Sequence, residues 1–397
     1  MTSAISNESE LYLTPGGPIH RLMQRMGIVE MTGNSVARRT IGLIAITWVP
    51  MCIFAFLQGN ALGPTPRGSF LLDFATYARF FIGVPIFVFA EASIGPRLRE
   101  AGLLFIRDGH VQPADYPAFE QAIARFAKRR ESTIVSFVLI ALAAFGAWKL
   151  TAEAASGNSL TGWQSVTFPE GHAFRVSLAG LWNHLVAVPI VLFLLYRWLW
   201  RLLSWTLFLL DVSKMDLKLV PTHADEAGGL GFLDIAHQSF GILAFGISCV
   251  LSAAGAFLIV YEGAKLESLA TPVIAILILN QILFLGPLLV FSPIMGRTWR
   301  TAMRQYGSLV VTYNREFDQK WAERTKPKAE PLLGSADIQS LADLGNSYRF
   351  VSEMNFAPFG KQAVIRIAAA TALPFLILPL LAMPIGDIID VLAKIAF

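Results

Sequence analysis

Six polar side chains stand inside long apolar segments of this chain. They are Asp73 and Arg79 in the second segment, Asn183 and His184 in the fourth, and Asn280 and Gln281 in the sixth. A charged side chain at the centre of a membrane costs at least about 2.5–3.5 kcal/mol, so such residues are rarely without a role. One interpretation is a solute or ion site, in which Arg79 attracts an anion and His184 relays protons. The other is structural, with Arg79 paired to Asp73 or to carbonyls and the amides bridging helices.

Helix geometry places three of these residues at similar depth. If the second, fourth and sixth segments all run inward, Arg79 lies about 14 Å and His184 about 10 Å from the outer end of its segment. Asn280 then lies near the depth of Arg79, so a polar layer is expected in the outer half of the membrane. Asp73 points about 120° away from Arg79 on an ideal helix, and a direct pair would need distortion.

A second group of reactive side chains lies between apolar segments, in Pro221–Phe232 (PTHADEAGGLGF). His223, Asp225 and Glu226 have the chemistry for metal binding or acid–base catalysis, but their spacing matches no metal-site pattern. The glycines that follow permit tight turns, yet they do not form GxGxxG and no strand precedes them. A loop that docks beneath the bundle and leads into the fifth segment explains these residues better than a nucleotide site does.

A third group lies in Gly334–Leu344 (GSADIQSLADL), where Ser335 and Asp337 could indicate a hydrolase or a phosphate site. The chain contains no GxSxG or HExxH motif. A helix over Asp337–Leu344, with Ser335 as its N-cap and Asp337 in its first turn, explains both residues more simply. We therefore predict no catalytic residue, no metal and no cofactor.

Charged residues also gather where the second and fourth segments end. Glu91 could pair with Arg197 or Arg201. The simpler interpretation has both arginines extending to lipid phosphates beside interfacial tryptophans.

The elements that carry these residues are membrane spans. Of 397 residues, 54% are hydrophobic and 15% are charged, which is too few charges for an ordinary soluble domain. Seven apolar stretches reach the length of about 20 residues that a span requires. They are Ile41–Gly59, Phe70–Ile94, Ser132–Leu150, Ser177–Trp200, Phe240–Glu262, Thr271–Met295 and Ile367–Ile389. The predicted fold is an all-α polytopic transmembrane bundle; the three prolines of the last stretch leave a re-entrant hairpin open.

Lysine and arginine fix the expected orientation, because they concentrate on the cytoplasmic side. Most of them lie before the first span and in the loops after the second, fourth and sixth. The N-terminus is therefore expected inside and the C-terminus outside. The same basic loops account for the net charge of +4, so no nucleic-acid partner is expected. Helices are expected over Asp115–Glu131, along the stripe Phe119, Ile123 and Phe126, and over Arg297–Trp321.

This gives four regions. They are a cytoplasmic N-terminal segment (1–40), a six-span bundle (41–295) with cytoplasmic loops 95–131 and 201–239, a cytoplasmic helical segment (296–366), and the last span with a short outer tail (367–397).

Two stretches, Leu219–Leu233 (LVPTHADEAGGLGFL) and Leu332–Ser347 (LLGSADIQSLADLGNS), carry a family resemblance. Together with Asp73, Arg79, Pro85 and Glu91 of the second span, they resemble an uncharacterised family of bacterial multi-pass inner-membrane proteins. The resemblance covers most of the chain after Ile41. It implies a bacterial inner membrane as the location and no particular activity.

Three functions follow from these observations. A transporter or channel for a small solute or ion ranks first, on the polar layer and the proline-broken spans. A membrane signalling or scaffold protein ranks second, and a membrane enzyme acting at the cytoplasmic interface third. The lipid bilayer is the expected partner. Ser248, Ser252 and Ala256 form a close-packing face that would fit either the bundle itself or a second protomer.

Overall fold

The computed structural model describes residues 34–156, 162–167, 174–323 and 336–382, and almost all of its regular structure is helical. Seven helical segments are long and apolar enough to cross a membrane, which confirms the predicted fold class. In chain order, spans one to seven are Val36–Leu57, Phe74–Arg107, Thr133–Ala152, Leu178–Ser213, Gly231–Glu262, Leu266–Ala322 and Lys361–Ala382.

Several spans join more than one helical element. Span one is α2 (Asn34–Leu57), which begins before the predicted Ile41, and span three belongs to α6 (Thr133–Ser156). The bounds in the other spans are α3 (Phe74–Tyr77) and α4 (Val84–Arg107), α7 (Leu178–Trp182) and α8 (Val188–Ser213), α9 (Gly231–Gln238) and α10 (Gly241–Glu262), α11 (Leu266–Leu285) and α12 (Ser292–Phe317), and α14 (Lys361–Ala372) and α15 (Ile377–Ala382).

Span two is the most buried of the seven because it lies between two groups of helices. On one side it contacts α2 and α8. Of these two helices, α2 also packs on α7, and α8 also packs on α6. On the other side it contacts α10, which packs on α14 and α15. Arg79 and Glu91 thus belong to the central span, and Asp73 caps its first helix.

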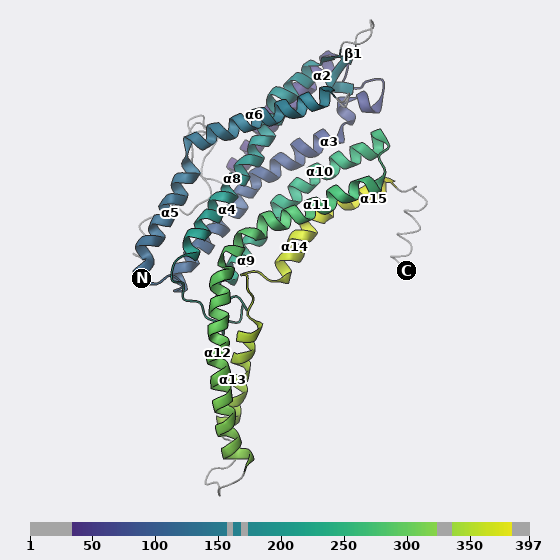
Figure 1. Cartoon of the computed structure of the whole chain (residues 1–397). Coiled ribbons are helices and arrows are strands. Elements are labelled where there is room, and N and C mark those ends of the chain that lie inside the picture. The colour runs from purple at the N-terminus through teal and green to yellow at the C-terminus, as the bar shows by residue number, and fades with distance from the viewer. Residues whose placement is uncertain (1–33, 157–161, 168–173, 324–335, 383–397) are drawn as a thin grey trace.

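The two ends of the bundle differ. We call the end that carries α5 (Tyr116–Glu131) the basic end. There α5 packs along α8, and the predicted stripe Phe119, Ile123 and Phe126 is fully buried. Beyond that end α12 continues out of the bundle and pairs with α13 (Ala336–Glu353) to form a projecting helical hairpin (Figure 1). The helix expected over Asp337–Leu344 is therefore too short, because α13 continues along α12 and buries Val351.

The opposite end carries a small β-hairpin that the sequence analysis did not predict (Figure 1). Strands β1 (Ser165–Thr167) and β2 (Phe174–Val176) pair antiparallel, with Ser165 opposite Val176. The preceding turn places Trp163 in the core, fully buried.

Spans two and four each contain a π-helical turn just before a proline. The turn η4 (Ala78–Gly83) precedes Pro85, and η7 (Asn183–Ala187) precedes Pro189. A proline lacks the N–H of a normal helix bond and its ring clashes with the preceding turn, so an extra residue in that turn relieves the clash. Both wide turns begin at or beside a polar residue of the predicted layer.

Span seven packs inside the bundle against the small-residue face of α10. Ser252 donates a 2.7 Å hydrogen bond to the Pro374 carbonyl, and Ala256 is buried with Phe375 and Leu378. This face is predicted to pack either within the bundle or against a second protomer. In the structure of the single chain it packs within the bundle. Span seven breaks at a 3-10 turn, Leu373–Leu376, where Pro374 interrupts the helix.

Candidate functional site

Arg79 is a half-buried cation in the central span of the bundle. It lies in η4, with its Cζ 5.9 Å from the centre of the Phe80 ring. Within the described ranges its guanidinium makes no hydrogen bond and no ion pair, although Asp73 and His184 lie close enough to interact with it electrostatically. A cation without a direct counter-ion in a membrane span has a high free-energy cost. Arg79 is therefore the strongest candidate for contact with a mobile ligand.

Asp73 lies near Arg79 but forms no direct ion pair with it, because its carboxylate is held by three other hydrogen bonds. It caps α3, accepting bonds from the amide and the hydroxyl of Thr76 at 3.1 and 2.8 Å, and the indole N–H of Trp163 donates to it at 2.9 Å. The residue is 4% exposed. Its hydrogen bonds therefore give it a structural role at the opposite end, where it ties the segment before β1 to span two.

The turn η7 brings two further polar residues into the same half of the bundle. Asn183 is 3% exposed, and neither its Oδ1 atom nor His184 Nε2 has a hydrogen-bond partner in the described part of the chain. Span one packs against both η4 and η7. From span one, Trp48 adds a buried indole nitrogen that also lacks a partner among the described residues. Sequence reasoning overlooked Trp48, since a tryptophan in an apolar segment gives no signal by itself.

Asn280 and Gln281 have hydrogen-bond partners elsewhere in the bundle. The Asn280 amide donates to Thr371 Oγ1 at 3.2 Å, and the Gln281 amide donates to the Val364 carbonyl at 3.0 Å. Both bonds connect α11 with α14. Both NH2 groups thus bridge helices, as the interhelical interpretation predicts, although Gln281 Oε1 is buried without a partner among the described residues. Because these two amides bind α14, the candidate layer reduces to Arg79, Asn183 and His184.

Glu91 binds two arginines from two other spans. Its Oε1 lies 2.6 Å from Arg201 Nη1, and its Oε2 accepts a 2.5 Å hydrogen bond from Arg39. The side chains of Glu91 and Arg201 are 7% and 5% exposed, and the Arg201 guanidinium lies 5.0 Å from the Trp198 ring centre. The prediction that Arg201 extends to lipid phosphates is therefore wrong, because α2 and α4 enclose it. The sequence analysis also missed Arg39 as a partner.

The segment 221–231 folds around Asp225. Its Oδ1 accepts from the amides of Ala227 and Gly229 at 2.9 and 3.1 Å, and its Oδ2 accepts from Gly231 at 2.8 Å. Burial alone would raise the pKa of the Asp225 carboxyl, but these three bonds and the His223 ring 2.8 Å away hold its pKa below the usual value. Asp225 thus organises the loop, which agrees with the docking-loop interpretation.

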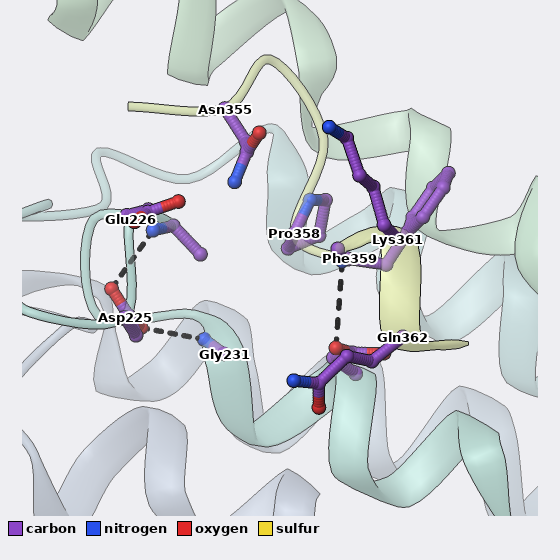
Figure 2. A pocket seen from close by; sticks show the side chains of 11 residues that line it. Asp225, Glu226, Gly231, Asn355, Pro358, Phe359, Lys361 and Gln362 are labelled. Carbon is purple, nitrogen blue, oxygen red and sulfur yellow. Dashed lines mark hydrogen bonds between the residues drawn. The ribbon is translucent and has the colours of Figure 1, made fainter. Parts of the chain in front are cut away.

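The same loop forms one wall of a cavity of about 370 Å³ at the basic end. Figure 2 shows Asp225 and Glu226 on that wall and Asn355, Pro358, Lys361 and Gln362 on the other. The backbone N–H of Asn355 donates to the Glu226 backbone carbonyl at 2.7 Å, with Glu226 in the left-handed region at φ 53°. These contacts join the loop before span five to the segment that begins span seven.

Asp234, on the floor of this cavity, accepts a long 3.5 Å bond from the Gly360 amide, and its second oxygen is buried without a partner in the described chain. The cavity thus offers acceptors on one side and the Lys361 amine on the other.

Asp337 lies far from this loop, at the outer end of the α12–α13 hairpin. Its carboxylate accepts a 2.8 Å bond from the Trp321 indole and a 2.7 Å bond from Lys320. His223, Asp225, Glu226 and Asp337 therefore form no common cleft. Ser335 lies outside the described residues, so its predicted capping role stays a prediction. In the described ranges no three His, Cys, Asp or Glu residues are placed to hold a metal ion.

His237 is a buried polar residue that sequence reasoning passed over. Its Nδ1 lies 2.7 Å from the Phe284 carbonyl and its Nε2 accepts from the Trp205 indole at 2.9 Å. These partners require a neutral ring protonated on Nδ1. A histidine between an indole donor and a carbonyl is fully satisfied, so we assign it to helix packing between α8, α9 and α11.

These features define an all-α membrane protein of seven spans with a cation in its central span that has no partner among the described residues. No family model, curated protein or solved structure matches the chain.

Proposed function

We propose that the protein is a transporter or channel for a small solute or ion, and that Arg79, Asn183 and His184 form the polar part of its pathway. The observation that carries this proposal is that the Arg79 guanidinium makes no hydrogen bond and no ion pair with any described residue. The chain neutralises Arg201 with Glu91 at the basic end, yet among the described residues it leaves Arg79 without such a pair. An anionic solute, or the carboxylate of a zwitterion, would give the Arg79 guanidinium the direct contact that Asp73 does not make.

The two wide turns support the same proposal. A π-helical turn frees backbone groups and opens the helix locally, and such turns are frequent at functional sites. Here the turns η4 and η7 place their free polar atoms toward the same half of the bundle, with span one beside both. The described cavities lie elsewhere, so the pathway would have to open between these spans during transport.

The proposal is tested by flux into proteoliposomes. We expect the wild-type chain to move at least one of chloride, inorganic phosphate and lactate, compared with sodium and glucose. Arg79→Gln should lower that flux at least about tenfold, because loss of a charged contact to the solute removes more than about 1.4 kcal/mol. Arg79→Lys should retain part of it. Arg67→Gln is the matched control, since Arg67 lies at the same end but is exposed and paired with Glu262.

Equal flux in wild type and Arg79→Gln would contradict the assignment of Arg79. A folded, monodisperse wild-type protein that moves none of the five solutes would contradict transport itself. That second result would favour a signalling or scaffold protein, which the projecting α12–α13 hairpin supports through its exposed Leu309, Val311 and Ile338.

We also propose that the membrane is a bacterial inner membrane and that the basic end faces the cytoplasm. The concentration of lysine and arginine at that end supports the orientation, and the family resemblance supports the location. After replacement of Cys52 and Cys249, a cysteine introduced at Ser308 should be protected from an impermeant maleimide in intact cells. One introduced at Lys265 should react. Reaction of both from the outside would overturn the proposed topology.

A further inference from the structure

A second and larger cleft lies at the basic end, away from the Asp225 loop. Its volume is about 930 Å³. One wall is the end of α8 with the segment that follows it, from Leu210 to Pro221. The other is the start of α12 with the turn before it, from Val290 to Gln305. The cleft therefore opens between spans four and six, where both leave the apolar part of the bundle.

Each wall contributes one cation. Lys214 and Arg297 line the cleft, both are exposed, and neither makes an ion pair within the described part of the chain. Arg297 donates one side-chain bond there, from Nε to the Pro293 carbonyl at 3.3 Å, which leaves its two terminal nitrogens available. Asp216 is the one acidic residue of the lining among the described residues, so the cleft has an excess of positive charge.

The position of Arg297 places the cleft near the membrane surface. No charged residue stands between Glu267 and Arg297, so Arg297 is the first charge after the apolar part of span six. A cation at this point of a span lies close to the lipid headgroups.

The interior of the cleft is apolar with added hydrogen-bond donors. Leu217, Leu219 and Ala302 are buried in its walls, and Val290 and Ile294 are half-buried beside them. The lining also includes the side chains of Thr298, Thr301 and Gln305, which can donate to an anion. A guanidinium with free terminal nitrogens binds phosphate in a bidentate manner, and a lysine adds a second, mobile charge.

We propose that this cleft binds a phosphate-bearing amphiphile, with the phosphate between Lys214 and Arg297 and the apolar part along Leu217, Leu219 and Ile294. Basic pockets between spans at the membrane surface are suited to anionic lipid headgroups. A free phosphorylated solute would offer the same phosphate chemistry. The proposal does not depend on transport.

The test measures binding to the full chain in neutral detergent by native mass spectrometry. The probes are phosphatidylglycerol, phosphatidylcholine and soluble glycerol 3-phosphate. We expect tighter binding of phosphatidylglycerol than of phosphatidylcholine, and a loss of about tenfold or more in Lys214→Gln/Arg297→Gln. The matched control is Lys218→Gln/Arg300→Gln, which removes the same charges from the same two segments outside the cleft.

Comparing the binding of phosphatidylglycerol and of glycerol 3-phosphate also distinguishes the two sources of phosphate. If glycerol 3-phosphate binds and displaces the lipid, the cleft serves a free phosphorylated solute. If only the lipid binds, the cleft serves a membrane lipid. Unchanged binding in the cleft variant, or an equal loss in the control variant, would overturn the proposal, since attraction would then come from general surface charge.

Discussion

Replacing Glu91 by glutamine is expected to destabilise the protein by about 3–5 kcal/mol, the usual effect of removing one partner from a buried ion pair. The carboxylate holds Arg39 and Arg201 together, and the Glu91 and Arg201 side chains are almost fully buried. Glutamine keeps the shape and one acceptor oxygen but leaves two guanidinium groups without a counter-charge. The free energy of unfolding in mixed micelles, measured by titration with a denaturing detergent, checks this result.

Glu100→Gln is the matched control. Glu100 lies on the same helix, α4, and pairs with Arg107 at 2.7 Å, but both side chains are about half exposed. Exposed pairs contribute about 0–1 kcal/mol, so this variant should remain close to wild type.

A double-mutant cycle with Arg201→Gln tests the cause. If burial of an uncompensated charge is responsible, the two substitutions together should cost less than the sum of their separate effects. Strict additivity, or equal effects of Glu91→Gln and Glu100→Gln, would show that the ion pair does not stabilise the contact among spans one, two and four.

The second large effect is expected from Gly229→Ala in the loop before span five. Gly229 has φ +92°, and a Cβ atom there would lie 2.5 Å from Cε1 of His110. The left-handed backbone costs a non-glycine residue about 1–2 kcal/mol. Overpacking against the buried His110 adds about 1–3 kcal/mol. Thermal unfolding of the purified protein should show a clear loss of stability.

Two comparison variants separate strain from clash. Gly109 has φ +71°, and among the described residues no atom would lie within 4 Å of a Cβ atom at this position, so Gly109→Ala should show the backbone effect alone. Adding His110→Ala to Gly229→Ala should recover stability relative to the loss caused by His110→Ala alone. If Gly109→Ala and Gly229→Ala destabilise equally, the close approach to His110 has no energetic weight.

The amino-acid sequence determined the class of fold, because apolar length and the scarcity of charge are sums over the chain that need no contacts. The seven spans followed from apolar length, whereas the buried stripe of α5 and the continuation of span six followed from helical periodicity. The two wide turns also had a sequence signal. Arg79 and Asn183 each stand six residues before a proline.

Pairing between residues distant in the chain could not be read from such patterns. Glu91 had two candidate arginines near the same interface, and only the packing of α2 and α8 on α4 selected Arg201 together with Arg39. Asn280 has a predicted depth close to that of Arg79, but depth along a helix does not specify the direction of a side chain around it. The rotation of α11 toward α14 sends Asn280 to Thr371.

The six polar residues of the apolar segments thus differ in their hydrogen-bond and ion-pair partners. Their presence inside spans was a property of the sequence alone. Which of them are neutralised, and which remain unpaired, depends on the position and rotation of neighbouring helices. Asp73 is used by Thr76 and Trp163, whereas Arg79 is left as a cation without a partner among the described residues, and only the tertiary structure decided this difference.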